Sequence, residues 1–302
     1  MTANRQTLTF LQNRFKEAGI RPETRHGQNF LIDLNLIDVL VDAADITKDD
    51  VVLEIGTGMG SLTGKLAERA GHVVTVEIDH RMHSLAAEEL ENFSNITMLL
   101  QDALRNKNNF HPAVMETVRE HVSAVPGRRF KLAANLPYNV ATPILSNLLT
   151  ETPEPVSLTA TIQKELADRM TAPPGTKDYS ALSIWMQAIA DIKTVRILPP
   201  QVFWPKPKVT SAIVHIVPNA EKRARVADLE FFHQFVRSVF LHRRKFLRSG
   251  VVHALSDRME KNVVDEVLDP FGFPNDIRAE QLDVETLIAL ADAFQTRLID
   301  GQ

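Results

Sequence analysis

The sequence predicts an α/β fold: a doubly wound, mostly parallel seven-stranded sheet followed by a small, all-helical C-terminal domain. Short apolar runs rich in β-branched residues alternate with amphipathic helical segments as far as about residue 218. A glycine-rich turn at residues 56–60 follows the first of these strand segments. Beyond residue 218 the strand pattern stops and the remaining segments have helical patterns. We therefore expect a larger α/β domain over residues 1–218 and a helical domain over 219–302.

Each element has its own signal in the chain. Apolar residues recur at helical spacing over residues 34–44, and a short β-branched run follows at 51–55. The same signals recur along the α/β region, with helices expected at 61–70, 80–90 and 143–149 and strands at 72–78, 95–101, 130–135, 156–162, 193–197 and 211–217. Because parallel strands are joined by crossovers, usually helices, this alternation indicates a parallel sheet with helices on its faces.

Composition excludes several kinds of chemistry. The 302 residues include no cysteine, which rules out disulfides, thiolate metal sites, iron–sulfur clusters and cysteine nucleophiles. The ten histidines lack the spacing of a zinc site, so we expect no metal. No apolar run is long enough to span a membrane, and the N-terminus lacks the uninterrupted apolar stretch of a signal peptide. We therefore expect a cytoplasmic protein with no membrane partner.

Charge is distributed unevenly. The formal net charge is −4, yet residues 221–250 contain eight Lys or Arg against three acids, whereas residues 251–302 contain four bases and eleven acids. A basic segment on a mildly acidic protein can form a surface for nucleic-acid phosphates. It can equally be a solvated helix surface, and charge alone does not distinguish the two.

Glycines and acids gather where the predicted strands end, which is where doubly wound sheets bind ligands. Gly56 and Gly58 let the backbone approach a ligand closely. Glu77, at the end of the second strand, can accept both hydroxyls of a ribose, and Asp102, after the third, can accept from an adenine amino group. Together they indicate a nucleoside-containing cofactor, and both NAD and S-adenosylmethionine fit so far.

The fourth strand end distinguishes the two cofactors. Asn135 offers a carbonyl acceptor, and the extended peptide before Pro137 can fix the Leu136 carbonyl toward the same point. Tyr138 supplies a flat face beside them. Two acceptors next to an aromatic ring favour a pocket for the exocyclic amine of a planar base. The stretch resembles the (Asn/Asp)-Pro-Pro-(Tyr/Phe) motif of amino-methylating enzymes, here in the form Asn-Leu-Pro-Tyr. We therefore expect S-adenosylmethionine and a direct in-line methyl transfer that needs no general base.

Nine segments extend the pattern from about residue 25 to residue 294. They are RHGQNFL (25–31), LEIGTGMGSLT (53–63), VEID (76–79), QDAL (101–104), NLPYN (135–139), QKELADRMTAPPGTKDYSALS (163–183), FWPKPKVTSA (203–212), FVRSVFLHRRKFLRSG (235–250) and EQLDVETLIALADAF (280–294). In this order they resemble the bacterial small-subunit rRNA adenine-N6 dimethyltransferase family (KsgA/RsmA type). The resemblance implies a Rossmann-like S-adenosylmethionine-dependent catalytic domain and a helical C-terminal domain that contacts rRNA.

The resemblance also implies a role for individual residues. Cofactor contacts are expected from Gln28, Asn29, Leu31, Gly56, Gly58, Glu77, Ile78, Asp102, Ala103 and Asn135. The target adenine is expected to meet Asn135, Leu136, Pro137, Tyr138 and Phe203, the last of which would close the other face of the flipped base. Contacts with RNA are expected from Arg243, Arg244, Lys245 and Arg248.

The implied reaction is dimethylation of two adjacent adenosines in the 3′-terminal hairpin loop of 16S rRNA, by a monomer acting on an immature small subunit. One alternative is a 23S rRNA adenine-N6 methyltransferase of the macrolide-resistance type. Another is a ribosome-assembly or mitochondrial transcription factor that methylates secondarily. Residues 172–180 and 203–212 favour the small-subunit enzyme.

The chain departs from the family pattern at several points. Gln101 stands where the family often has glycine, and Phe246 stands where a small polar residue is frequent. Thr57 stands where proline is common, and residues 104–129 form a longer segment than usual. Neither the Thr57 nor the Gln101 departure removes a group that the reaction requires.

Overall fold

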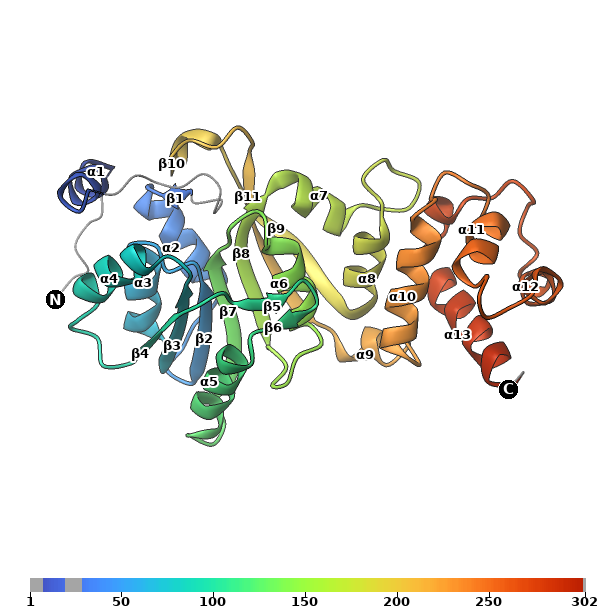
Figure 1. Ribbon diagram of the computed structural model, residues 1–302, viewed down its shortest axis with the longest axis horizontal. Coiled ribbons are helices and arrows are strands. Elements are labelled where there is room, and N and C mark those ends of the chain that lie inside the picture. Colours follow the sequence, from blue (N-terminus) through green and yellow to red (C-terminus); the bar gives the residue numbers. More distant parts are fainter. Residues whose placement is uncertain (1–7, 20–28, 301–302) are drawn as a thin grey trace. The chain divides into compact units, whose positions relative to one another are not determined.

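The structure is a computed structural model that describes residues 8–19 and 29–300 (Figure 1). The chain forms two compact units, composed of Met1–Ala167 with Lys193–Pro218 and of Asp168–Ile192 with Asn219–Gln302. The first unit contains the sheet. The second includes residues 168–192 as well as the C-terminal helices, so the structural division differs from the simple boundary at residue 218. The functional assignment of the two parts stays a prediction.

A seven-stranded sheet forms the centre of the first unit. Its strand order is β4-β3-β2-β7-β8-β11-β9. The strands are β2 (Asp50–Ile55), β3 (His72–Glu77), β4 (Ile96–Leu100), β7 (Arg129–Asn135), β8 (Ser157–Gln163), β9 (Ala190–Leu198) and β11 (Ser211–Pro218). The first five strands in this order, β4, β3, β2, β7 and β8, pair in parallel, and β11 pairs antiparallel with β8. The predicted seven-stranded, mostly parallel sheet is confirmed, because each predicted strand segment overlaps one of these strands.

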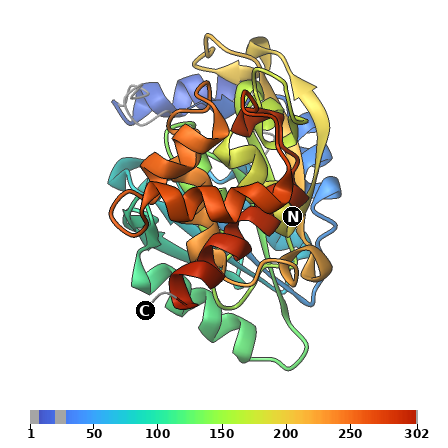
Figure 2. The ribbon, with the colours of Figure 1, turned by 90° about the vertical axis from the view of Figure 1, so that its right-hand side faces the viewer.

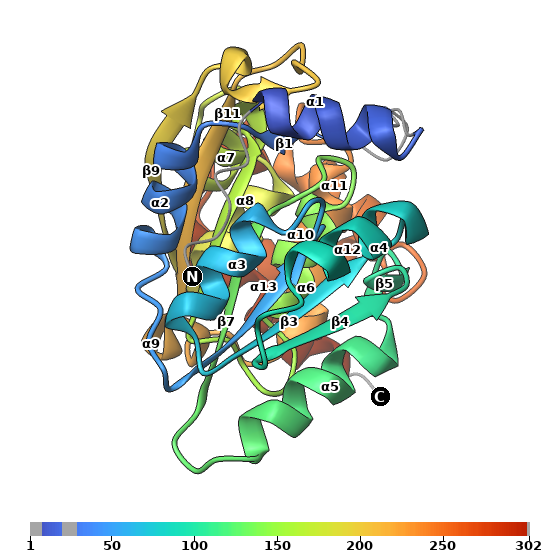
Figure 3. The ribbon, with the colours of Figure 1, turned by 90° about the vertical axis from the view of Figure 1, so that its left-hand side faces the viewer.

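Crossover helices cover the two faces of this sheet. From β2 the chain moves outward to β4 through α3 (Ser61–Arg69) and α4 (His80–Glu89). It then returns through α5 (Pro112–Ser123) to β7 and continues through α6 (Ala141–Leu148) to β8. Because such crossovers are right-handed, the reversal of direction places α3 and α4 on one face of the sheet and α5 and α6 on the other (Figure 3). Strand order therefore switches between β2 and β7, where a ligand crevice is expected.

Local sequence explains how these elements begin. Helix α2 (Leu34–Ala43) precedes β2 and starts after Asp33, whose carboxylate accepts a hydrogen bond from the Asn35 N–H. Asp79 caps α4 in the same way by accepting from the Arg81 N–H. Such caps satisfy backbone donors that a helix leaves unpaired at its first turn. Strand β2 is buried along its whole length, as expected of an inner parallel strand.

Several elements of the first unit were not predicted. They are α1 (Leu8–Glu17), the crossover helix α5, the antiparallel pair of β1 (Phe30–Leu31) and β10 (Phe203–Trp204), the hairpin of β5 (Leu104–Asn106) and β6 (Asn109–Phe110), and the short 3-10 helix η2 (Pro200–Val202). The long segment 104–129 is thus mainly a hairpin and the crossover helix α5. Two-residue strands have no detectable period, because alternation needs at least four residues to be visible.

Apart from the start of β9 at residues 190–192, the regular elements described in the second unit are helices (Figure 2). This unit contains the second half of α7 (Lys164–Thr171), followed by α8 (Ala181–Ile189), α9 (Ala220–Arg223), α10 (Leu229–Phe240), α11 (Leu247–Ala254), α12 (Lys261–Leu268), η3 (Asp269–Phe271), η4 (Ala279–Gln281) and α13 (Val284–Asp300). Helix α10 buries Phe232, Phe235 and Val239, and Phe235 packs against Phe294 of α13. The predicted helical C-terminal region is confirmed. None of the described helices is both long and apolar enough to cross a membrane.

Candidate cofactor and target-base site

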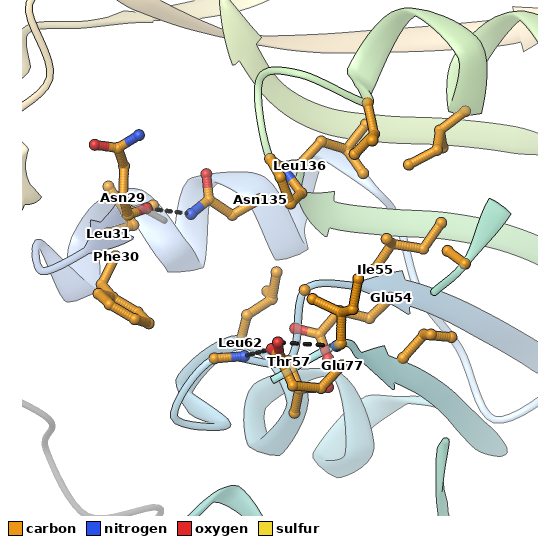
Figure 4. A pocket seen from close by; sticks show the side chains of 18 of the residues that line it. Asn29, Phe30, Leu31, Glu54, Ile55, Thr57, Leu62, Glu77, Asn135 and Leu136 are labelled. Carbon is orange, nitrogen blue, oxygen red and sulfur yellow. Dashed lines mark hydrogen bonds between the residues drawn. The ribbon is translucent and has the colours of Figure 1, made fainter. Parts of the chain in front are cut away.

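A cavity lies in the first unit at the carboxyl ends of β2, β3, β4 and β7 (Figure 4). Its walls include most of the predicted site residues, namely Asn29, Leu31, Gly56, Gly58, Glu77, Ile78, Asp102, Ala103, Asn135, Leu136, Pro137 and Tyr138. Gln28 lies outside the described residues. Residues from separate stretches of sequence therefore meet at the point where the strand order switches.

The glycine-rich turn after β2 forms one wall of the cavity. Gly56 and Gly58 have φ angles of 90° and 57°, a backbone conformation that favours glycine. Space also restricts Gly58, because a Cβ atom there would lie 3.0 Å from the Phe30 ring. The turn thus needs glycine both for its conformation and for the close approach of β1.

Glu77 holds this turn in place from the end of β3. Its Oε2 accepts a hydrogen bond from the Gly58 N–H at 2.9 Å, and its Oε1 accepts from the N–H groups of Ile78 and Asp79, each at 3.0 Å. Burial raises the pKa of Glu77, although these backbone donors favour its charged form. The carboxylate is fixed at the cavity wall, and the acceptor site that remains on Oε2 suits a hydroxyl of a ribose.

The end of β4 supplies an acceptor and an unpaired donor. Asp102 accepts a hydrogen bond from the Leu104 N–H at 2.9 Å, which orients its carboxylate. The neighbouring Gln101 lines the cavity, and its amide nitrogen is buried without a hydrogen-bond partner in the described part of the chain. A buried amide that lacks a partner is costly, so this donor indicates a ligand with an acceptor here. In the sequence, Gln101 stood out only as a departure from the family pattern.

Asn135 lies on the opposite side of the cavity, where β7 ends. Its amide nitrogen donates to the Asn29 carbonyl oxygen at 2.9 Å, as Figure 4 shows. That bond orients the side chain and leaves the amide oxygen Oδ1 free to accept. The residue therefore presents an acceptor, which is the group that an exocyclic amine needs.

Tyr138 is held by a hydrogen bond from outside its own loop. Its hydroxyl lies 2.6 Å from Oγ of Ser211, the buried first residue of β11. Burial raises the pKa of the Tyr138 phenol, so the hydroxyl remains protonated at neutral pH. The bond ties the aromatic ring to the sheet and limits its rotation.

Phe203 is not among the residues that line the cavity. It is 2% exposed and lies opposite Leu31 in the β1–β10 pair. Its neighbour Trp204 packs edge-on against Phe15 of α1, with ring centroids 5.2 Å apart. The structure thus places Phe203 in the same core cluster as Leu31, and its stacking role stays a prediction.

Helix α1 contributes a wall that the predicted site residues did not include. Leu11 lines the cavity, and Leu11 and Phe15 are buried in a cluster with Met59 and Met82. Arg14 on the same helix donates to Glu88 of α4 at 2.6 Å. The spacing of Leu8, Leu11 and Phe15 could have revealed this helix.

Glu54 is a second wall residue that the predicted set lacked. It is fully buried, and its Oε2 accepts from the hydroxyls of Thr63 at 2.6 Å and Thr75 at 2.7 Å. Burial raises the pKa of Glu54 to about 8, and the nearby charge of Glu77 acts in the same direction. A carboxyl within an otherwise apolar strand segment, directly before a glycine turn, is the sequence signal that could have identified it.

This pKa predicts how stability depends on pH. Between the ordinary carboxyl pKa and about 8, the folded protein keeps a proton on Glu54 that the unfolded chain releases. Stability without cofactor should therefore fall as pH rises through this window, by up to about 1.4 kcal/mol per pH unit, and Glu54→Gln should remove that contribution. Urea unfolding of both proteins from pH 5 to 9 measures the difference. Parallel pH profiles would show that Glu54 is ionised in the folded state.

The four predicted RNA-contacting residues lie in the second unit and differ from one another. Arg243 donates to the carbonyls of Lys177 and Tyr179, and Arg248 donates two hydrogen bonds to the carboxylate of Asp265. Arg244 and Lys245 are exposed, and neither has a carboxylate partner among residues 8–19 and 29–300. Of the four, these two can bind phosphate without breaking an internal ion pair. Their role in RNA binding stays a prediction.

The fold and the site together define a Rossmann-like methyltransferase. The sheet has a glycine turn at its switch point and an Asn-Leu-Pro-Tyr strand end at the same cavity. The chain belongs to the ribosomal RNA adenine dimethylase family, whose model matches residues 20–290.

Relatives and solved structures agree with this assignment. The chain is 40% identical over 269 residues to ribosomal RNA small subunit methyltransferase A of Geobacillus thermodenitrificans, covering 89% of each chain. It is 35% identical over 271 residues to the protein of that name from Halothermothrix orenii, covering 89% of this chain and 86% of the relative. A dimethyladenosine transferase from Plasmodium falciparum matches with a TM-score of 0.73 and 25% identity, over 88% of this chain and 97% of that one. The 23S rRNA methyltransferase ErmE matches with a TM-score of 0.60 and 26% identity, over 88% and 100%.

Proposed function

We propose that this protein uses S-adenosylmethionine to dimethylate the N6 amino groups of two adjacent adenosines in the 3′-terminal hairpin loop of 16S rRNA. The observation that supports it most is the geometry of Asn135, whose amide nitrogen is bonded to Asn29 and whose oxygen is therefore free to accept. An acceptor beside Tyr138 suits a planar base with an exocyclic amine. The proposal includes an immature small subunit as substrate and a monomer in the cytoplasm, as the family resemblance implies.

The small-subunit substrate is supported by the names of the relatives. The two from Geobacillus thermodenitrificans and Halothermothrix orenii are small-subunit methyltransferases, and the alignments span nearly nine-tenths of both chains. The match to ErmE favours a second candidate, the methylation of 23S rRNA. Its TM-score of 0.60 is lower than the 0.73 of the dimethyladenosine transferase. We therefore prefer the small-subunit substrate.

The cavity residues fit the proposed cofactor. Glu77 would accept the ribose hydroxyls, Asp102 the adenine amino group, and the unpaired amide of Gln101 would donate to an adenine nitrogen or to the ribose. The glycine turn leaves room for close approach of the backbone. When bound, S-adenosylmethionine supplies an electrophilic methyl group on a sulfonium.

The chain's own residues would prepare the amine for transfer. An adenine amino nitrogen is a weak nucleophile because its lone pair is delocalised into the ring. If Asn135 Oδ1 and the Leu136 carbonyl accept its two N–H bonds, the lone pair is directed out of the ring plane. Tyr138 would stack on the base, and Ser211 would keep that ring in position. The amine proton becomes acidic only once nitrogen carries positive charge, so no general base is required at the start.

One experiment tests this function directly. The protein is incubated with methyl-labelled S-adenosylmethionine and, separately, with each ribosomal subunit isolated without its adenosine modifications, and the labelled nucleotides are mapped. We expect two adjacent dimethyladenosines near the 3′ end of 16S rRNA. Label in 23S rRNA alone would establish the second candidate, and label in neither would refute both.

The bond between Tyr138 and Ser211 predicts a specific pattern of mutant effects. Tyr138→Ala should weaken base stacking by about 1–3 kcal/mol, while Tyr138→Phe should retain most activity because the ring face remains. Tyr138→Phe and Ser211→Ala each remove the same hydrogen bond, which contributes about 0.5–1.5 kcal/mol. The double variant should therefore be no worse than either single one, as judged by the apparent KM for RNA. Fully additive effects would show that the two hydroxyls act independently.

The exposed side chains of Arg244 and Lys245 lead to a prediction about how RNA binding depends on salt. If both meet phosphates, replacing both by alanine should flatten the plot of log affinity against log salt by about 0.7–0.9 for each lost contact. Arg297, an arginine of the same unit that pairs with Glu266, serves as the control and should leave the slope unchanged when replaced by alanine. An unchanged slope for the Arg244→Ala, Lys245→Ala protein would assign these residues to a solvated surface.

A further inference from the structure

The connection between α10 and α11 exposes two large apolar side chains. Leu241 is 69% exposed and Phe246 is 48% exposed. Single apolar residues are common on protein surfaces and need no explanation by themselves. Phe246 differs from Leu241 because of its surroundings.

Three cations lie next to Phe246 in the chain or across from it. Arg244 and Lys245 immediately precede it, and Arg278 is its partner in an isolated antiparallel β-bridge. All three are exposed, and none has a carboxylate partner within the described ranges 8–19 and 29–300. Side chains opposite each other in a bridge lie on the same side, with Cβ atoms about 4.5–5.5 Å apart. The Arg278 side chain therefore emerges beside the Phe246 ring.

The backbone around Phe246 is fixed rather than free. The Leu247 N–H donates to the Ile277 carbonyl at 2.8 Å, and the Arg278 N–H donates to the Gln281 side chain at 2.8 Å. Leu247, the next residue, is buried and begins α11. A ring on an anchored backbone can bind a partner at a low cost in conformational entropy.

We propose that Phe246 is a stacking platform for an unpaired base of single-stranded RNA, with Arg244, Lys245 and Arg278 contacting the neighbouring phosphates. This inference rests on the proposed function, because it assumes an RNA substrate. Aromatic rings inside a cationic surface are the usual means of binding single-stranded nucleic acid, since every base has a face that can stack.

The charges favour RNA over a protein partner. The centres of protein interfaces are depleted in lysine, and a protein partner would need several acids of its own to match three unpaired cations. An RNA strand carries a phosphate at every nucleotide and a stackable base beside it. The nearby acids Glu280 and Asp265 are already engaged by Arg243 and Arg248, so the cations around the ring are not neutralised by them.

The test uses the full-length protein and a single-stranded oligoribonucleotide that carries one 2-aminopurine, whose fluorescence is quenched by stacking. At fixed salt, Phe246→Ala should weaken RNA binding about 5- to 150-fold, which is the range for loss of one stacked base. It should also reduce the quenching of 2-aminopurine. The slope of log affinity against log salt should be the same for Phe246→Ala and the wild type, whereas Arg278→Ala should lower that slope by about 0.7. Phe246→Tyr should bind normally. Leu241→Ala, the matched control from the same connection, should leave the RNA affinity, the quenching and the salt dependence unchanged.

The outcomes separate this proposal from the proposed function. Equal affinity and equal quenching for Phe246→Ala and wild type would overturn the platform, even if the wild type methylates 16S rRNA. Weaker binding of Phe246→Ala to the whole small subunit, but not to free RNA, would also overturn it by indicating a protein partner. If Phe246→Ala loses RNA affinity while the wild type methylates neither subunit, the platform stands and the proposed function fails. Thermal melts establish that each variant is folded.

Discussion

Replacing Asn135 by alanine should slow methyl transfer by at least about tenfold while leaving RNA binding nearly unchanged. The amide oxygen is held toward the target by the bond from its nitrogen to the Asn29 carbonyl, so its loss removes an acceptor that matters most in the transition state. Affinity for RNA should depend mainly on the basic surface of the second unit. Single-turnover rates with saturating enzyme, together with equilibrium RNA binding, separate the two effects.

Two further variants make the result interpretable. Asn135→Asp keeps the size and an acceptor but loses the N–H that Asn29 receives, so it too should transfer methyl groups slowly. Asn147→Ala alters an asparagine on α6 that donates to the Lys107 carbonyl, and it should react at the normal rate. Folding must be checked because Asn135 ends a strand of the sheet. A folded, cofactor-binding Asn135→Ala protein that dimethylates normally would refute the role given to this residue.

Replacing Glu77 by alanine should weaken S-adenosylmethionine binding by on the order of 1.5–3 kcal/mol, the range for hydrogen bonds to a charged group. The side chain has two functions in the structure, since it faces the cavity and accepts the Gly58, Ile78 and Asp79 N–H groups. Its loss should remove a ribose contact and also loosen the glycine turn. Calorimetric titration measures the affinity.

The two functions of Glu77 can be separated. Glu77→Gln keeps an acceptor for part of the backbone contacts and removes the charge, so it should lie between wild type and Glu77→Ala. Glu68→Ala, which replaces an exposed acid on α3, is the control and should bind cofactor normally. If Glu77→Ala melts at a lower temperature but binds cofactor as tightly as the wild type, Glu77 stabilises the turn and is not the ribose ligand.

Much of the sheet could be predicted because the signals are local. A strand buried on both faces, such as β2, appears as a continuous apolar run, and the glycines that end it are needed for φ angles that other residues avoid. The polar residues at strand ends could be grouped from the sequence alone, because parallel strands carry their carboxyl ends to one edge. The same reasoning missed β1 and β10, since two-residue strands have no period.

The sequence by itself determined the fold class, the strand ends that carry polar residues and the identity of the chemical groups that meet there. Only the tertiary structure decided which of those groups are held and which are free. Asn135 is oriented by Asn29, 106 residues away, and Tyr138 by Ser211, 73 residues away. Phe203 is buried in the apolar core of the first unit, and Arg248 but not Arg244 has an acid within reach among the described residues. The physical reason is that local periodicity reports only which face of an element is buried, whereas a hydrogen-bond partner distant in sequence is chosen by how the elements pack.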